Sequence, residues 1–167
     1  MKAIPMLLAF AVCALCGQRM AGRLQTRKHL LTTLAHDMET LAAAALRTRR
    51  PLGELLGVCS IAPQTQALLQ HYCEQRTKTS HKQAWTETAA QHAVALTPLQ
   101  ADETAALAET LQAFTAGDQS TLQKQSAALQ ALLRERSEAA AKDAKEKGKL
   151  YRSVGLLLGA AVAVIMM

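Results

Sequence analysis

Four cysteines and five histidines are the residues of this sequence whose side chains are best suited to catalysis or metal binding. Cys13 and Cys16 form a Cys-x-x-Cys pair, but it lies inside an apolar run with no second pair and no nearby histidine, which argues against a metal or redox site. His71 and Cys73 are two residues apart, so on a helix their side chains point in different directions. A nucleophilic Cys/His pair therefore remains only a minor alternative.

The acidic residues show no catalytic pattern either. Neighbouring acids such as Asp102 and Glu103 are typical of solvated helix faces or partner contacts, and no pair is marked out as a general acid and base. The sequence contains no glycine-rich phosphate loop, HExxH or GxSxG motif. We therefore predict a noncatalytic protein with no metal site and no cofactor.

Composition indicates a helical protein. Hydrophobic residues make up 50% of the 167 residues and aromatic residues only 3%, with 8 glycines and 4 prolines, which favours helices packed through alanine and leucine. The net charge is +6. Nucleic-acid binding would require a basic stripe within the folded part, preferably with aromatic residues nearby, whereas the bases gather beside the apolar ends. We expect no nucleic-acid partner.

Two uncharged apolar runs, residues 3–17 and 154–167, lie at the two ends of the chain. Each is shorter than the roughly 20 residues that span a bilayer. Because flanking Arg and Lys side chains can snorkel, both runs extend to near the spanning length. We predict an N-terminal anchor over residues 1–21 and a C-terminal anchor over residues 150–167.

The first run could instead be a cleaved signal peptide, since Lys2 precedes the apolar stretch. No small-x-small cleavage site stands out, and Leu15 stands before Cys16 where a lipoprotein signal requires a small residue. Retention as an anchor is therefore favoured over cleavage.

Basic residues flank both apolar runs on the side that faces the middle of the chain. Positive charge beside a membrane segment tends to keep that side in the cytosol. Residues 22–149 are thus predicted to be cytosolic, with both termini across the lipid bilayer. The membrane-flanking bases are Arg19, Arg23, Lys147, Lys149 and Arg152.

Prolines and capping residues divide the middle of the chain into helices. A long helix is expected to continue from the first anchor to about Arg47, on the spacing of its leucines. We predict an all-α fold, a cytosolic bundle of about five to six helices flanked by the two membrane helices. Later helices are expected to start near Pro51, Pro63, Ser80, Thr97 and either Asp118 or Ser120, with an end at Gly117.

Two further expectations concern packing and the approach to the second anchor. Trp85 is expected to lie in the core, and Val94 and Leu99 on apolar helix faces. Residues 134–152 are polar nearly all round but rich in alanine and in Glu–Lys spacings that support a helix. They predict a solvated helical stalk with Gly148 as a joint, and a disordered linker is the alternative.

Four segments together resemble the stage III sporulation protein AB family of endospore-forming bacteria, and the likeness covers nearly the whole chain. The segments are GQRMAGRLQTRKHLLTTL, RPLGELLG, LAETLQAFTAGDQSTLQ and KGKLYRSVGLLLGAAVAVIMM. The most specific positions are Gly17, Met20, Ala21, Pro51, Leu52, Glu54, Asp118, Gln123, Lys147, Tyr151, Ser153, Gly155 and Gly159.

This resemblance implies a bundle similar to the cytoplasmic domain of the platform protein, component F, of type II secretion and type IV pilus machines. It implies a scaffold in the mother-cell membrane around the forespore, within a secretion-like complex that links the two cells. The implied partners are a secretion-type cytoplasmic ATPase of the same operon and other small membrane proteins. A homo-oligomer is a further option.

The partner surface is expected on polar faces of the cytosolic helices. Before the Pro-Leu pair the family tends to carry glutamates and a tyrosine, whereas this chain has LAAAALRTRR over residues 41–50, which puts that part of the contact in doubt. The predicted surface residues are Glu54, Glu103, Glu109 and Asp118.

A small membrane-perturbing protein, such as a holin-like pore former, is the competing class. Such proteins are also small, basic and helical, but they would not need a cytosolic part of this length. A membrane-tethered enzyme that uses Cys73 with His71 is the less favoured third class.

Overall fold

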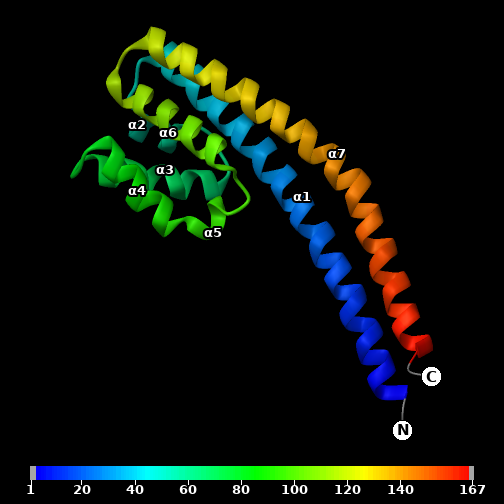
Figure 1. Ribbon diagram of the computed structural model, residues 1–167. Coiled ribbons are helices and arrows are strands. Elements are labelled where there is room, and N and C mark those ends of the chain that lie inside the picture. Colours follow the sequence, from blue (N-terminus) through cyan, green and yellow to red (C-terminus); the bar gives the residue numbers. More distant parts are fainter. Residues whose placement is uncertain (1–2, 166–167) are drawn as a thin grey trace. The chain divides into compact units, whose positions relative to one another are not determined.

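The computed structural model describes the backbone of residues 3–165, which is all helix and connecting turns (Figure 1). The all-α prediction is confirmed. Side chains are described except at residues 3–10, 13, 14, 152, 155, 156, 158, 159 and 162–165. The helices of the described part are α1 (Ala3–Thr48), α2 (Leu52–Val58), α3 (Pro63–Arg76), α4 (His81–Gln91), α5 (Ala93–Leu96), α6 (Ala101–Ala116) and α7 (Gln119–Ile165).

The chain divides into two compact units. Unit 1 combines Met1–His29 with Ser137–Met167, and unit 2 is Leu30–Arg136. The long helices α1 and α7 each contribute to both units. The first helix runs without a break from the N-terminal apolar segment to Thr48, as the leucine spacing predicts.

Unit 2 contains a hydrophobic core built mainly from leucine. The helices α1, α2, α3, α6 and α7 all contribute to it, and burial of each leucine stabilises the fold by about 1.5–3 kcal/mol. Tyr72 of α3 is buried in the same core. The fully buried aliphatic side chains are Leu31, Met38, Leu41, Leu55, Leu69, Leu107, Leu111, Leu129 and Leu133.

Helices α3 and α4 form a hairpin, and α4 starts from a capped turn. The Ser80 hydroxyl accepts a hydrogen bond from the Gln83 amide, which confirms the predicted cap. The phenol oxygen of Tyr72 lies 2.7 Å from Nδ1 of His81, so the buried tyrosine has a polar partner at the start of α4.

Buried polar groups tie other elements of unit 2 together. The Asp37 carboxylate, buried on α1, accepts hydrogen bonds from the Ala62 amide at 3.2 and 3.3 Å, just before Pro63 opens α3. The Thr110 hydroxyl of α6 lies 3.4 Å from the Gln125 carbonyl of α7. Both contacts satisfy polar groups that would otherwise be costly to bury.

Two helix ends adopt the left-handed conformation. Gly117 has φ 75° and ends α6, as predicted. Arg49 has φ 56° just after α1, and its amide donates to the Ala45 carbonyl at 2.8 Å. Pro51 follows two residues later and prevents α1 from continuing.

The region after α4 differs from the prediction. The helix that starts at Ser80 ends at Gln91, and Val94 lies on the short α5 with 90% of its surface exposed. Trp85 is only half-buried, so it does not lie in the core as predicted.

The start of α6 also differs from the prediction. The helix begins at Ala101, not at the Thr97–Pro98 pair, and Leu99 before it is half-buried. A capping box explains the later start: the Glu103 carboxylate accepts from the Gln100 amide at 2.7 Å, while the Gln100 side chain accepts from the backbone of the first turn.

In unit 1 the first part of α1 and the last part of α7 lie side by side (Figure 1). The buried residues among its described side chains are small: Gly17, Ala21, Ala140 and Gly148. Within the described residues, none of the helices has both the length and the apolar character that a membrane span requires. The larger exposed apolar side chains of unit 1 are Val12, Leu15, Met20, Leu150, Val154 and Leu157.

The segment before the C-terminal apolar run is helical throughout. Helix α7 passes through residues 134–152 without a break, so this segment is helical and is not a disordered linker. The helix also continues through Gly148, so the expected joint at that residue is not observed. The residue is buried within unit 1, although a Cβ at this position would meet no atom within 4 Å.

Candidate interaction surfaces

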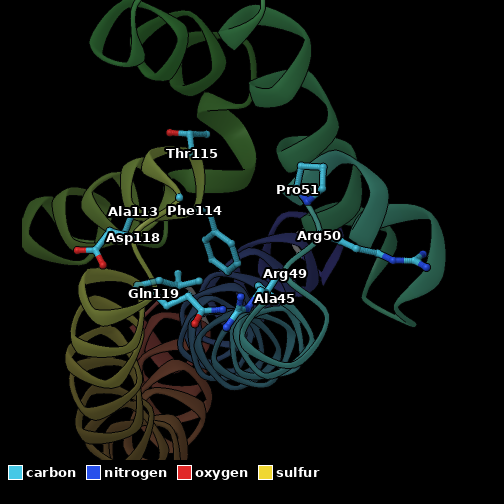
Figure 2. Close-up of a pocket in the computed structure, with 11 residues that line it drawn as sticks. Ala45, Arg49, Arg50, Pro51, Ala113, Phe114, Thr115, Asp118 and Gln119 are labelled. Atoms are coloured by element: carbon cyan, nitrogen blue, oxygen red, sulfur yellow. The ribbon is translucent and has the colours of Figure 1, made fainter.

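A cleft of about 570 Å³ lies in unit 2, where the end of α1 meets the turn between α6 and α7 (Figure 2). One side is formed by Ala45 and residues 49–51, and the other by residues 113–115, 117–119 and Leu122. The volume lies within the range of about 300–1,000 Å³ that is typical of ligand pockets. Two of the four family-like segments, RPLGELLG and LAETLQAFTAGDQSTLQ, thus meet at one place.

Two exposed arginines stand on the α1 side of the cleft. Arg49 has a left-handed backbone, and Arg50 is restricted to extended conformations because Pro51 follows it. Figure 2 shows the Arg49 side chain near Ala45 and the Arg50 side chain beside Pro51, with the Arg50 guanidinium directed away from the Phe114 ring. The guanidinium group can bind a carboxylate through two parallel hydrogen bonds.

The opposite side of the cleft is partly apolar. Phe114 and Leu122 are buried core residues that reach the cleft lining. Thr115 and Gln119 also line this side. In Figure 2 the Phe114 ring lies toward the middle, between Asp118 on one side and the arginines on the other. The lining can therefore accept both an apolar and a charged group.

Asp118 is the predicted surface residue that lines this cleft. Its carboxylate accepts hydrogen bonds from the Ser120 amide at 3.0 Å and from the hydroxyls of Ser120 and Thr121. Hydrogen bonding from the Thr121 hydroxyl, then from the Ser120 amide, lowers the pKa of Asp118. The carboxylate thus caps the first turn of α7, as the sequence predicts.

The other predicted acidic residues are in different environments. Glu54 on α2 and Glu109 on α6 are exposed, as a partner contact requires. Glu103 is fully buried, with 0% of its surface exposed, and its carboxylate belongs to the α6 capping box. The prediction that Glu103 lies on an exposed contact surface is therefore wrong. Its place in the capping box with Gln100 buries this carboxylate, which the pattern of neighbouring acids does not reveal.

The predicted membrane-flanking bases lie in unit 1. Arg19, Arg23, Lys147 and Lys149 are exposed, and the side chain of Arg152 is outside the described residues. Unit 1 holds ten of the 19 basic residues and only three of the 13 acidic ones, a net charge of +7. Unit 2 consequently carries −1, which together give the +6 of the chain.

One of these bases has an ion-pair partner on its own helix. The ammonium group of Lys147 lies 2.8 Å from the Asp143 carboxylate, one turn away on α7. This hydrogen bond raises the pKa of Lys147. Because both side chains are exposed, the pair contributes little to stability.

His71, from the minor enzyme alternative, has partners other than Cys73. Nδ1 of His71 lies 3.2 Å from the Thr88 hydroxyl, and Nε2 lies 3.2 Å from the Gln75 amide. Burial raises the pKa of the Cys73 thiol, which disfavours the reactive thiolate. Within the described residues, no group of three or more His, Cys, Asp and Glu side chains could hold a metal ion.

The fold defines the class of this protein: a small helical domain whose first and last helices extend into a strongly basic helical pair. The family model of stage III sporulation protein AB matches residues 2–167. The chain therefore belongs to the stage III sporulation protein AB family and has a sporulation role. No curated protein and no solved structure matches the chain.

Sequence reasoning did not identify most of the cleft. The sequence patterns predict no role for five of its lining residues, Arg49, Arg50, Phe114, Thr115 and Gln119. The first two end the LAAAALRTRR run that departs from the family pattern. The signal that could have found the two arginines is this run, which places three bases in four positions without an acid. Contact with the α6–α7 turn depends on tertiary structure.

Proposed function

We propose that this protein is a noncatalytic platform subunit of a sporulation-specific, secretion-like complex that links mother cell and forespore. In this proposal unit 1 anchors the chain in the mother-cell membrane, and unit 2 binds or couples to a cytoplasmic ATPase of the secretion type. The observation that carries the proposal is the division of charge and burial between the two units, in a chain of the stage III sporulation protein AB family.

The membrane assignment is supported by unit 1. Both apolar ends belong to this unit, and its larger described apolar side chains, such as Leu15 and Leu157, are exposed to the surroundings. Apart from Lys2, which precedes the first apolar run, nine bases of unit 1 face three acids, and this excess of six positive charges suits the anionic headgroups of a cytosolic leaflet. We infer that both ends enter the bilayer and that the bases next to them stay on the cytosolic side.

The docking role is supported by unit 2. It has a leucine-rich core of its own, together with a cleft and exposed acids. Glu54, Glu109 and Asp118 present negative charge on three different elements, and such charges set the specificity and rate of association more than its strength. We assign the contact with the ATPase, and with other small membrane proteins of the complex, to this unit.

Affinity purification of the tagged full chain from gently solubilised membranes of sporulating cells tests the proposal. Mass spectrometry should recover a secretion-type ATPase together with small membrane proteins. Recovery of the protein alone from well-solubilised membranes would contradict the platform role.

Charge reversal tests the contact surface. Replacing Glu54, Glu109 and Asp118 by lysine should reduce ATPase recovery, because the partner would lose its complementary charges. The matched control is Glu74→Lys, which changes an exposed glutamate on α3 outside the predicted surface. Circular dichroism should show equal helix content in all variants. Equal recovery with every variant would discard this surface.

A holin-like pore former is the second candidate, and it is favoured by the exposed apolar side chains of unit 1. Such a protein should make cells permeable when it is expressed alone, whereas a platform subunit should not. The Cys/His enzyme makes a separate prediction: Cys73→Ser should abolish its function, while a platform subunit should tolerate that change.

A further inference from the structure

The cleft at the end of α1 is a basic site on a unit that is otherwise slightly acidic. Unit 2 carries a net charge of −1, yet three of its nine basic residues stand within four positions: Arg47, Arg49 and Arg50. No acid follows until Glu54 on α2. The positive charge is therefore local to this end of the unit.

The backbone holds an arginine where a helix usually ends in glycine. Arg49 has φ 56°, and a residue with a Cβ in the left-handed region costs about 1 kcal/mol. The nearby α6 end follows the usual rule, with Gly117 at φ 75°. The arginine thus occupies its position at the expense of stability, which is a pattern found at binding sites.

The carboxylate of Asp118, which lines the cleft, already accepts hydrogen bonds within the protein. The Asp118 carboxylate accepts three hydrogen bonds from Ser120 and Thr121 at the start of α7. In Figure 2 this side chain lies across the Phe114 ring from Arg49 and Arg50. The two guanidinium groups consequently retain hydrogen-bonding capacity for an external carboxylate.

We propose that this cleft binds an acidic segment of a partner protein, in which carboxylate side chains flank an apolar residue. Arg49 and Arg50 bind the carboxylates, and the surface next to Phe114 and Leu122 receives the apolar side chain. Charge complementarity and the mixed lining both favour such a segment. The inference rests on the proposed function only in requiring a protein partner.

The test measures fluorescence anisotropy of a labelled peptide of alternating Glu and Leu, titrated with the full chain in zwitterionic lipid nanodiscs. A peptide with Lys in place of Glu is the probe control. The cleft variants are Arg50→Glu and Gln119→Glu. The matched controls are Lys82→Glu and Gln123→Glu, which make the same charge changes at exposed residues outside the cleft.

We expect the Glu peptide to bind and the Lys peptide to bind much more weakly. Arg50→Glu should weaken binding about tenfold and Gln119→Glu about threefold, while both controls stay within about twofold of the wild-type affinity. Because Gln119 is exposed at a helix start, its variant should fold even if the arginine variant does not.

Three results would overturn the assignment: no binding of the Glu peptide, equal binding of both peptides, or equal losses in cleft and control variants. The titration does not involve the ATPase, so it separates this inference from the proposed function. Failed ATPase capture together with binding that is sensitive to Arg50→Glu would refute the platform role and support the acidic-segment site. Successful ATPase capture together with peptide binding that is insensitive to Arg50→Glu would refute the acidic-segment site alone.

Discussion

Units 1 and 2 are both helical, but they differ in which side chains they bury and in net charge. Unit 2 buries large side chains such as Leu111 and Tyr72 and carries almost no net charge. In the described part of unit 1 the buried residues are glycine and alanine, and large apolar side chains such as Leu157 are 69% exposed. Unit 1 also carries a net charge of +7.

The difference shows where each unit obtains its stability. A core of leucines stabilises unit 2 by removing apolar surface from water. Small residues bury too little apolar surface to hold two long helices together by the same effect, so unit 1 depends on its surroundings. A basic helical pair with exposed apolar ends fits a bilayer with anionic headgroups, and this is the physical basis of the proposed anchor.

The largest contrast is expected from leucine truncation. Leu111→Ala in unit 2 should lower the free energy of unfolding by about 3 kcal/mol, because it leaves a cavity in a packed core. The exposed Leu150→Ala in unit 1 should change it by less than about 0.5 kcal/mol. Urea titration of the full chain, followed by the fluorescence of Trp85, measures both. Equal effects would contradict the assigned difference between the units.

Glutamate removal should give the next largest contrast. Glu103→Ala in unit 2 removes a buried carboxylate that caps α6 and should cost about 2 kcal/mol. Glu138→Ala in unit 1 removes an exposed acid and should be close to neutral. The same urea titration compares them, and a neutral Glu103→Ala would show that the capping box does not stabilise the unit.

Glycine replacement should produce a smaller contrast, of opposite sign in the two units. Gly117→Ala should destabilise unit 2 by about 1 kcal/mol, because φ 75° strains any residue with a Cβ. Gly22→Ala should slightly stabilise the helix of unit 1, since nothing lies within 4 Å of the added carbon. Thermal unfolding measured by circular dichroism should show the two shifts, and shifts of the same sign would contradict this explanation.

Acidification should have the smallest effect and act on unit 2. Burial and then the nearby Arg76 lower the pKa of His81 from 6.5, and Tyr72 is its hydrogen-bond partner. The unfolded chain binds the proton more readily than the folded one, so the free energy of unfolding falls as the pH drops through 6.5.

His81→Gln is the matched variant for this pH dependence. It should flatten the decrease between neutral and mildly acidic pH, as followed by Trp85 fluorescence. In unit 1, by contrast, Asp143 raises the pKa of Lys147, and that contribution is lost only as the pH rises through the lysine range. An unchanged slope in His81→Gln would exclude His81 as the cause.

The sequence predicted the parts of the fold that depend on local chemistry. Leucine spacing gave the long first helix, and Ser80 and Gly117 ended or began helices where expected. The predicted start of α6 was wrong, because the Gln100–Glu103 capping box favours a start at Ala101 over one at the Thr97–Pro98 pair. The sequence prediction also failed at Val94, whose exposure depends on the break between α4 and α5.

The candidate site shows the same limit. Asp118, Glu54 and Glu109 could be proposed from the sequence because exposed acids are visible as polar residues between apolar ones. The burial of Glu103 could not be seen, since buried and solvated acids look alike in a sequence. The cleft depends on contact between residues about 65 positions apart, which no local pattern reveals.

The central claim is that both ends of the chain enter the membrane while unit 2 stays on the cytosolic side. Labelling with a membrane-impermeant maleimide tests it most directly, in a cysteine-free chain with single cysteines at Lys78 in unit 2 or added at either terminus. In inverted vesicles the cysteine at position 78 should react and both terminal cysteines should be protected, with the reverse in right-side-out vesicles. Reaction of all three cysteines from the same side would contradict the account.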